Sequence, residues 1–332
     1  MSCEIDRADA NDMLKEKVKI LKYHLYVQLE QHKAYNNIKN NMGENEMLVH
    51  VDFAENYENK QQSEIQSAYF GHTTFSIFTA CCYTRDSNDQ IQKHNIALVT
   101  EASDHSRIAA HTLIIRVIEE VKLRVGFTDG VTIHLWSDGC AAQFRSRFVF
   151  RLTTLFPENY TVIRYYNERH HGKGPMDGIG GCIKNKVYRA VLSEKVVIGS
   201  PKDFAEFADA NVNNISVIYV PNSDIITEPD YIKDTRYVDA MQTLQVHMIR
   251  SNKTKAGFHY LEFFKIATDE LPFYTHWYPR PNDQKEPCGH IDLPTDLSAN
   301  ETCASCLEGE TGSSWICCPV CEQWYHDECY EN

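Results

Sequence analysis

The sequence lacks long hydrophobic runs and a secretory leader, and each absence excludes a class of protein. No apolar stretch reaches the roughly 18 residues that a membrane-spanning helix needs. The opening residues, MSCEIDRADANDMLK, do not show the basic and then apolar layout of a signal peptide. We therefore expect a soluble intracellular protein that has no contact with a membrane.

Positive charge is also in short supply. Lysine and arginine together number 33 against 46 aspartates and glutamates, which gives a formal net charge of −13. This balance argues against a general nucleic-acid coat, because nonspecific affinity for DNA comes mostly from neutralising phosphates. It does not exclude a basic groove confined to one part of the surface.

The composition is otherwise that of a globular protein. Apolar residues make up 42% and aromatic residues 11% of the 332 residues, which is enough for a sizeable core. This length predicts one large domain with accessories, or two domains. Half of the twelve cysteines lie in the last thirty residues with paired spacing. In a reducing compartment such pairs are more often metal ligands than disulfide partners.

Hydrophobic periodicity predicts alternating strands and helices after one long N-terminal helix. The N-terminal helix is either packed on the main domain or paired with another chain, so a homo-oligomer is compatible with it. A helix capped by Ser103 or Asp104 is expected to be largely buried. The expected helices are 12–42, 105–125, 141–156 and one from Pro175 onward, and the expected strands are 47–52, 63–70, 74–83, 131–137 and 160–167.

The order of these elements predicts an α/β fold with a mixed five-stranded sheet. The first three strands have short connections and form an antiparallel meander, whereas the last two follow helices and pair in parallel. Helices then cover both faces of the sheet. A weaker pattern follows, with a short helix at 201–210 and strands at 215–220 and 244–250. The expected divisions are 1–46 (N-terminal helix), 47–195 (core), 196–278 (mixed accessory region), 279–300 (linker) and 301–332 (cysteine-rich end).

Three aspartates occupy comparable places in this order. Asp52 ends the first strand, Asp138 follows the strand 131–137, and Asp177 lies at the start of the last helix. In a mixed sheet with right-handed crossovers the first and fourth strands can be central neighbours, with their carboxyl ends side by side. Glu55 and Asp104 are nearby acids that could take one of these places. A single aspartate at a strand end is more often a cap or turn former.

Three converging carboxylates cannot all stay ionised without a counter-charge. Divalent cations resolve that conflict, and hard oxygen ligands in this number suit Mg²⁺ or Mn²⁺. Two such ions, about 3.5–4 Å apart, would clamp the attacking and leaving oxygens of a phosphodiester. The sequence therefore predicts a magnesium or manganese site at Asp52, Asp138 and Asp177.

The stretch HHGKGPMDGIGG surrounds the third of these acids. Its glycines would let the backbone approach a phosphate chain, and N–H groups at a helix start favour anions. The same glycines could instead pack the helix tightly against the sheet. The residues concerned are His170, His171, Gly172, Lys173, Gly174, Gly178, Gly180 and Gly181.

Basic residues follow the second and third acids and predict a local phosphate-binding groove. A solvated helix face is the alternative explanation for such a charge run. The predicted nucleic-acid contacts are Arg145, Arg147, Lys173 and Lys184, with Arg151, Lys186 and Arg189 close to them in sequence.

The segments VDFAENY, LWSDGCAAQFRSR and HHGKGPMDGIGG resemble the catalytic core of DDE/DDD-type transposases encoded by mobile elements. The resemblance covers roughly residues 47–192 and implies a ribonuclease-H-like fold. It also implies that Asp52, Asp138 and Asp177 are the catalytic, metal-binding acids. Many members of the wider superfamily carry glutamate at the third place, where this chain has Asp177.

The C-terminal segment CASCLEGETGSSWICCPVCEQWYHDEC combines thiolate and imidazole ligands in an order that suits tetrahedral zinc. A fragment this small has no core of its own to fold around. The predicted zinc ligands are Cys303, Cys306, Cys318, Cys321, His326 and Cys329.

This segment resembles the front of a PHD finger, in which the ligands interleave. The resemblance implies one complete site from Cys303, Cys306, His326 and Cys329. Cys318 and Cys321 would need two further cysteines, and the chain ends before supplying them. Either the finger is truncated, or Cys317 and another group such as Cys288 complete a distorted second site.

The sequence leads to competing functional hypotheses. The first is a transposase-derived, nuclear enzyme that cuts and joins DNA by two-metal phosphoryl transfer. The second is an inactive, domesticated transposon protein that binds DNA or chromatin. In it, the PHD-like finger recruits the protein to chromatin through a histone tail. Trp315 and Trp324 match positions that in some PHD fingers stack on methylated lysine, and structural packing is the alternative role for both. A third is a nuclease of the same fold that acts on RNA–DNA hybrids or branched DNA.

Overall fold

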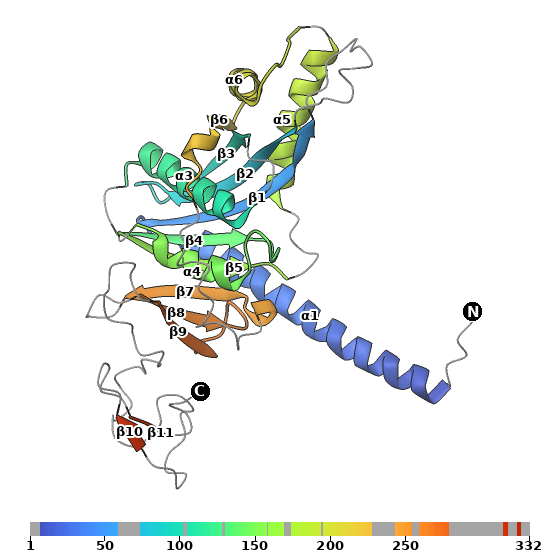
Figure 1. Cartoon of the computed structure of the whole chain (residues 1–332), viewed down its shortest axis with the longest axis vertical. Helices are drawn as coiled ribbons and strands as arrows, with labels where there is room; N and C mark the ends of the chain where they lie inside the picture. The colour runs from blue at the N-terminus through green and yellow to red at the C-terminus, as the bar shows by residue number, and fades with distance from the viewer. Residues whose placement is uncertain are drawn as a thin grey trace.

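A mixed nine-stranded β-sheet forms the centre of the molecule (Figure 1). The computed structural model describes residues 7–58, 74–101, 105–127, 130–157, 159–168, 174–193, 195–227, 243–253, 259–278, 315–317 and 324–326. The strand order is β6-β3-β2-β1-β4-β5-β7-β8-β9. The strands are β1 Glu46–Glu58, β2 Thr74–Arg85, β3 Ile91–Thr100, β4 Val131–Ser137, β5 Tyr160–Tyr166, β6 Ser216–Val220, β7 Met248–Lys253, β8 His259–Phe264 and β9 Tyr274–Tyr278.

The middle of the sheet has the predicted mixed pairing. Strand β1 pairs antiparallel with β2 and parallel with β4, and β5 continues in parallel on the far side of β4. The α/β class and the central position of β1 beside β4 are therefore confirmed. The expected number of five strands is too small.

Four further strands widen the sheet at its two edges. Strand β6 joins β3 in parallel, and β7, β8 and β9 extend the other edge antiparallel beyond β5. The region 196–278, predicted as an accessory, thus contributes strands to the central sheet. The strand predicted at 63–70 lies outside the described residues, and β3 takes the third place in the meander.

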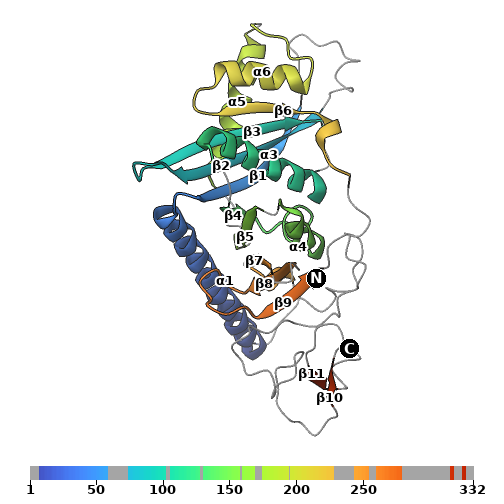
Figure 2. The ribbon, with the colours of Figure 1, turned by 90° about the vertical axis from the view of Figure 1, so that its left-hand side faces the viewer.

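Helices cover both faces of the sheet, as predicted. One hydrophobic core joins the sheet to α3 (Arg107–Val125) and α4 (Arg147–Leu152). The other joins it to α5 (Pro175–Leu192), α6 (Pro201–Asn211) and the C-terminal part of α1 (Arg7–Asn41). Figure 2 shows α1 and α4 on opposite sides of the sheet.

Two helix starts differ from the prediction because serines act as caps. The side chain of Ser106 accepts the Ala109 N–H and starts α3, so the predicted cap at Ser103 or Asp104 is wrong. Ser146 accepts the Val149 N–H in the same way and starts α4. The helix predicted over 141–156 is therefore reduced to α4, followed by one 3₁₀ turn at Thr153–Leu155.

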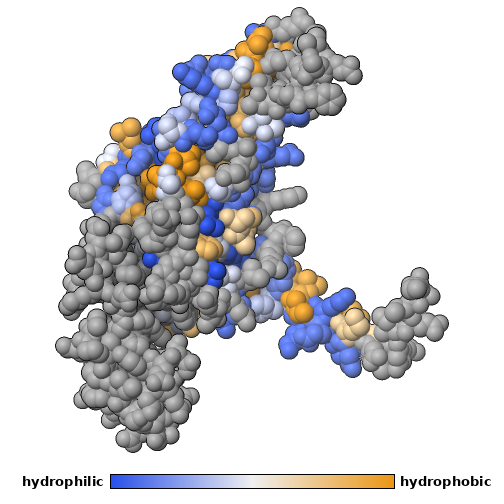
Figure 3. Space-filling model, in the orientation of Figure 1, coloured by the Kyte–Doolittle hydropathy of each residue, from blue (hydrophilic) through white to orange (hydrophobic). Residues whose placement is uncertain are grey.

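Helix α1 has two halves in different environments. Val27 and Ala34 are buried against the sheet, whereas the N-terminal half projects away from the body (Figure 1). Leu14 and Leu21 in that half are 60% and 53% exposed. Figure 3 shows apolar residues among hydrophilic ones on this projecting segment. No helix in the described ranges is both long and apolar enough to cross a membrane.

The cysteine-rich end contributes two short antiparallel strands. Strand β10 (Trp315–Cys317) pairs with β11 (Trp324–His326), so that Trp315 stands opposite His326. The predicted linker 279–300 and the predicted ligands Cys303, Cys306, Cys318, Cys321 and Cys329 lie outside the described residues.

Candidate functional site

Two of the three predicted acids lie next to each other across the central strands. The parallel register pairs Leu48 with His134 and His50 with Trp136. Asp52 and Asp138 each come two residues after this last pair, and the charge of Asp138 acts on Asp52. Successive side chains alternate between faces, so both acids lie on the face covered by α5. The predicted juxtaposition of these two residues is therefore present.

Asp52 does not end its strand, however. Strand β1 continues to Glu58, and what ends near Asp52 is the pairing with β4. A β-bulge interrupts the pairing with β2 between Ala54 and Tyr57. Bulges change the direction of the strand beyond them, and here two regularly paired residues separate the acid from the bulge.

Asp177 occupies the first turn of α5, as predicted. Pro175 opens the helix at a position that needs no N–H donor. The Gly174 N–H donates to a carboxylate oxygen of Asp177 at 3.2 Å, so this acid helps to cap its own helix. A carboxylate in the first turn is also stabilised by the positive end of the helix dipole.

Close packing fixes the distance between α5 and β1. A β-carbon on Gly180 would lie 2.9 Å from the β-carbon of Ala54, closer than side chains allow. Gly180 is buried at this contact and serves helix–sheet packing, one of the two explanations that the sequence left open. Nothing lies within 4 Å of where a β-carbon on Gly178 or Gly181 would be, so these two glycines leave open space beside Asp177.

The charges of Asp138 and Asp177 both act on Asp52. Burial first, and then the charges of Asp138 and Asp177, raise the pKa of Asp52 to about 7. Burial also raises the pKa of Asp138, although the Cys140 N–H, which donates to its Oδ1 at 3.1 Å, partly offsets this effect. Asp52 is therefore an acid poised to give up its proton near neutral pH.

The other acids considered from the sequence have different surroundings. The Glu55 side chain is 95% exposed, and its carboxylate lies 3.9 Å from Lys184 Nζ. Lys184 also donates to the backbone oxygen of Glu55. Asp104 lies outside the described residues. Glu55 thus sits at the rim of the site, where it holds a predicted phosphate-binding lysine.

The predicted basic groove is only partly at the surface. Arg145 is fully buried, and its Nε donates to the backbone oxygen of Thr243 at 3.1 Å. A guanidinium in this position ties two loops together and has no surface through which to meet a phosphate. Arg147 is half-buried with its guanidinium 5.1 Å from the Phe148 ring. Lys173 lies outside the described residues.

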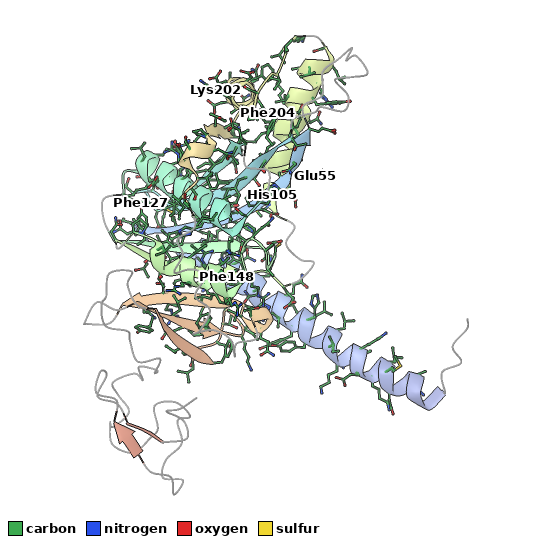
Figure 4. The ribbon with its side chains drawn as sticks, in the orientation of Figure 1. Glu55, His105, Phe127, Phe148, Lys202 and Phe204 are labelled. Carbon is green, nitrogen blue, oxygen red and sulfur yellow. The ribbon has the colours of Figure 1, made fainter. Side chains whose placement is uncertain are left out.

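A polar cluster that the sequence did not predict lies at the same end of β1. The His105 ring stacks on Phe53 at 4.2 Å, and its Nε2 lies 2.6 Å from the Asn56 side-chain oxygen. Figure 4 labels His105 and Glu55 at this end of the strand. The sequence offered little to find it, because His105 precedes α3 by a turn with a φ of 46° rather than by a regular element.

The three acids have the oxygen ligands that a divalent cation prefers, but their side chains are not arranged as a complete coordination shell. Within the part of the chain that the structure describes, no three His, Cys, Asp or Glu side chains are grouped closely enough to hold an ion as they stand. Mg²⁺ characteristically uses one or two carboxylates and completes its shell with waters and substrate phosphates. Asp52 and Asp138 would supply those carboxylates, with Asp177 facing the same space.

The chain matches one family in comparison with known proteins. Its description is a domain of unknown function (DUF8701), and it covers residues 31–257, which is more than half of the chain. No curated protein matches the sequence. The matched range includes all three acids together with α3, α4, α5 and most of the sheet.

Proposed function

The chain belongs to the family described as a domain of unknown function (DUF8701), and from its carboxylate site we propose a divalent-metal-dependent enzyme that cleaves and joins DNA. The reaction would be phosphoryl transfer at a phosphodiester, in a protein descended from a transposase. The single observation that carries this proposal is that Asp52 is buried where the charges of both Asp138 and Asp177 act on it and raise its pKa.

The topology supports the same proposal. Three antiparallel strands followed by two parallel strands, with acids at the β1–β4 boundary and at the start of α5, agree with a ribonuclease-H-like core. In α/β sheets ligands bind outside the carboxyl ends of parallel strands, which is where Asp138 lies. The edge strands β6 to β9 would be additions to that core.

Each residue has a distinct part in the proposed reaction. Bound Mg²⁺ or Mn²⁺ would supply positive charge to the attacking and leaving oxygens. Asp52 would release its proton as it becomes a ligand, since its pKa of about 7 leaves it partly protonated at neutral pH. Asp138 would be held in place by the Cys140 N–H. The start of α5 would offer backbone N–H groups and the open space beside Gly178 to the phosphate.

The test is cleavage of DNA by the full chain. Supercoiled plasmid and end-labelled duplex are incubated with Mg²⁺, Mn²⁺, Ca²⁺ or EDTA, and nicking and strand transfer are followed on gels. We expect products with Mg²⁺ or Mn²⁺ and none with EDTA.

Matched variants connect the activity to the site. Asp138→Asn should remove the activity, whereas Glu55→Gln should retain it, because Glu55 is an exposed acid at the rim. Full activity of Asp138→Asn would eliminate the proposed centre. Retained DNA binding without cleavage by the unmodified chain would favour the alternative of an inactive DNA- or chromatin-binding protein.

A further inference from the structure

A second site lies on the same face of the sheet, between α1 and the start of α5. It is a partly open pocket of about 220 Å³. Aromatic side chains make much of its wall, and polar groups from α1 and from the loop after β5 complete it. The residues that matter for the argument are Tyr35, His50, Tyr83, Trp136, Glu168 and Gly174.

Two buried polar groups in this wall lack partners. The Trp136 side chain is 1% exposed and its indole N–H meets no acceptor among the described residues. His50 is 6% exposed and its Nδ1 likewise has no partner in the described part of the chain. Buried polar groups are nearly always hydrogen-bonded, and an indole nitrogen can only donate. The wall of the pocket therefore includes one buried N–H donor that has no acceptor among the described residues.

Three of the elements that line the pocket, β1, β4 and the start of α5, also lead to the acids. His50 precedes Asp52 by two residues on β1, and Trp136 on β4 precedes Asp138, the first residue after that strand, by two residues. Two residues of strand span about 6.6 Å, so pocket and acids are neighbours on one face. Gly174 lines the pocket and also donates its N–H to Asp177.

The volume of the pocket and the side chains that line it limit the class of ligand that it can bind. The volume equals roughly seven water molecules at about 30 Å³ each, more than a single ordered water needs. It is below the roughly 300–1,000 Å³ of sites for drug-sized ligands, which leaves room for one planar ring system. Tyr35 and Tyr83 offer ring surfaces, and Trp136 supplies an N–H donor. The Glu168 carboxylate at the pocket already lies 2.7 Å from His247 Nε2 and 3.3 Å from His24 Nδ1.

We propose that this pocket binds a single unpaired nucleobase of the DNA whose phosphate lies at Asp52, Asp138 and Asp177. The proposal rests on the proposed function and adds the way in which the substrate is recognised. An unstacked base is held by aromatic contacts and by hydrogen bonds to its edge, which are the two kinds of group that the pocket provides. A base so held fixes the position of the adjoining phosphate over the acids.

The test compares two DNA duplexes that differ by one unpaired base. The full chain is titrated with a fully paired duplex and with the same duplex carrying a single-base bulge, with Ca²⁺ replacing Mg²⁺ to prevent cleavage. We expect binding of the bulged duplex to be at least about tenfold tighter. The four nucleosides, titrated separately by calorimetry, should bind weakly and with different affinities.

Two substitutions should remove the preference by different routes. Trp136→Phe deletes the N–H while keeping a ring to stack against Tyr165, which lies 4.8 Å away. Asn36→Trp fills the pocket from its exposed rim on α1. Asn37→Trp is the matched control, because Asn37 is the next exposed residue of α1 and does not line the pocket.

Each result has a definite meaning. The proposal is supported if Trp136→Phe and Asn36→Trp lose the preference for the bulged duplex. Asn37→Trp and Asp138→Asn should keep that preference. Equal binding of both duplexes with no nucleoside bound, or a preference that survives Asn36→Trp, overturns it. If the protein prefers the bulged duplex but shows no metal-dependent cleavage, base binding in the pocket stands and the proposed function is removed. If it cleaves DNA but shows no preference for the bulged duplex, the proposed function stands and base binding in the pocket is removed.

Discussion

The acid site and the aromatic pocket are neighbours on one face of the sheet, yet burial acts on them in opposite directions. It raises the pKa of Asp52 to about 7 and lowers the pKa of His50 to about 4. In both cases the buried environment disfavours the charged form. The acid site is thereby prepared for a cation, whereas His50 in the pocket wall stays neutral and suits an uncharged ring.

The two groups also give opposite dependences of stability on pH. Between about pH 4 and 7 folded Asp52 holds a proton that the unfolded chain has released, so stability falls as pH rises. Between about pH 4 and 6.5 unfolded His50 binds a proton that the folded protein excludes, so stability rises with pH. The two effects largely cancel in the unmodified protein, and only single substitutions will expose each of them.

The largest expected effect is on activity. Asp52→Asn should lower metal-dependent DNA cleavage by at least about a thousandfold, which corresponds to about 4 kcal/mol. In the unmodified protein kcat/KM should rise about tenfold per pH unit below pH 7 and then level off, since Asp52 must ionise. Initial rates across this range measure the profile, and a flat profile would rule out Asp52 as the controlling group.

The next effect concerns the stability of the metal-free protein. At pH 8 the free energy of unfolding of Asp52→Asn should exceed that of the unmodified protein by no more than about 4 kcal/mol. This limit follows from a pKa raised by about three units, at about 1.4 kcal/mol for each unit. The difference should vanish below pH 4, where the carboxyl is neutral in both states. Urea unfolding in EDTA measures it, and Glu55→Gln is the exposed control. An unchanged stability at pH 8 would mean that Asp52 is not buried as described.

A slightly smaller effect of opposite sign belongs to the pocket. His50→Gln, which keeps polar atoms without a titrating ring, should remove a pH-dependent loss of about 3 kcal/mol as pH falls from 6.5 to 4. The same urea titration, run on both proteins, provides the comparison. If His50→Gln leaves the dependence of stability on pH between about 4 and 6.5 unaltered, the pocket does not exclude the protonated imidazole of His50.

The smallest effect tests how α5 is held against the sheet. Gly180→Ala should destabilise the protein by about 1–3 kcal/mol, because its methyl group would meet Ala54 at 2.9 Å. Gly181→Ala is the neighbouring control and should stabilise it by about 0.5–1 kcal/mol, since helix propensity rises in open space. Thermal unfolding of both variants measures the two effects. Equal shifts of the melting temperature would contradict the close approach of Gly180 to Ala54.

Local patterns predicted the centre of the fold well. Strand β4 has the predicted limits, Val131–Ser137, because a short apolar run is bounded by Gly130 and Asp138. The start of α5 at Pro175 was likewise correct. Strand β3 was missed because four of its first five residues, IQKHN, are polar and none of the five is buried; only its second half is buried.

Tertiary context decided what the sequence could not. Charge next to an acid predicted a surface role for Arg145, but the loop that carries it folds inward to meet Thr243, nearly a hundred residues away in sequence. The pocket was equally hidden, since Tyr35, His50 and Trp136 come from three separate elements and only their packing brings them together. The three acids could be predicted from the sequence because each one marks a boundary of strand pairing or of a helix.

The most direct measurement of the carboxylate site is a crystal structure of the full chain grown with Mn²⁺, with anomalous diffraction used to locate the ion. The account predicts anomalous density about 2 Å from carboxylate oxygens of both Asp52 and Asp138, on the side facing Asp177, and its loss in Asp138→Asn. Saturating Mn²⁺ that leaves this position empty while the three carboxylates keep their places would contradict it.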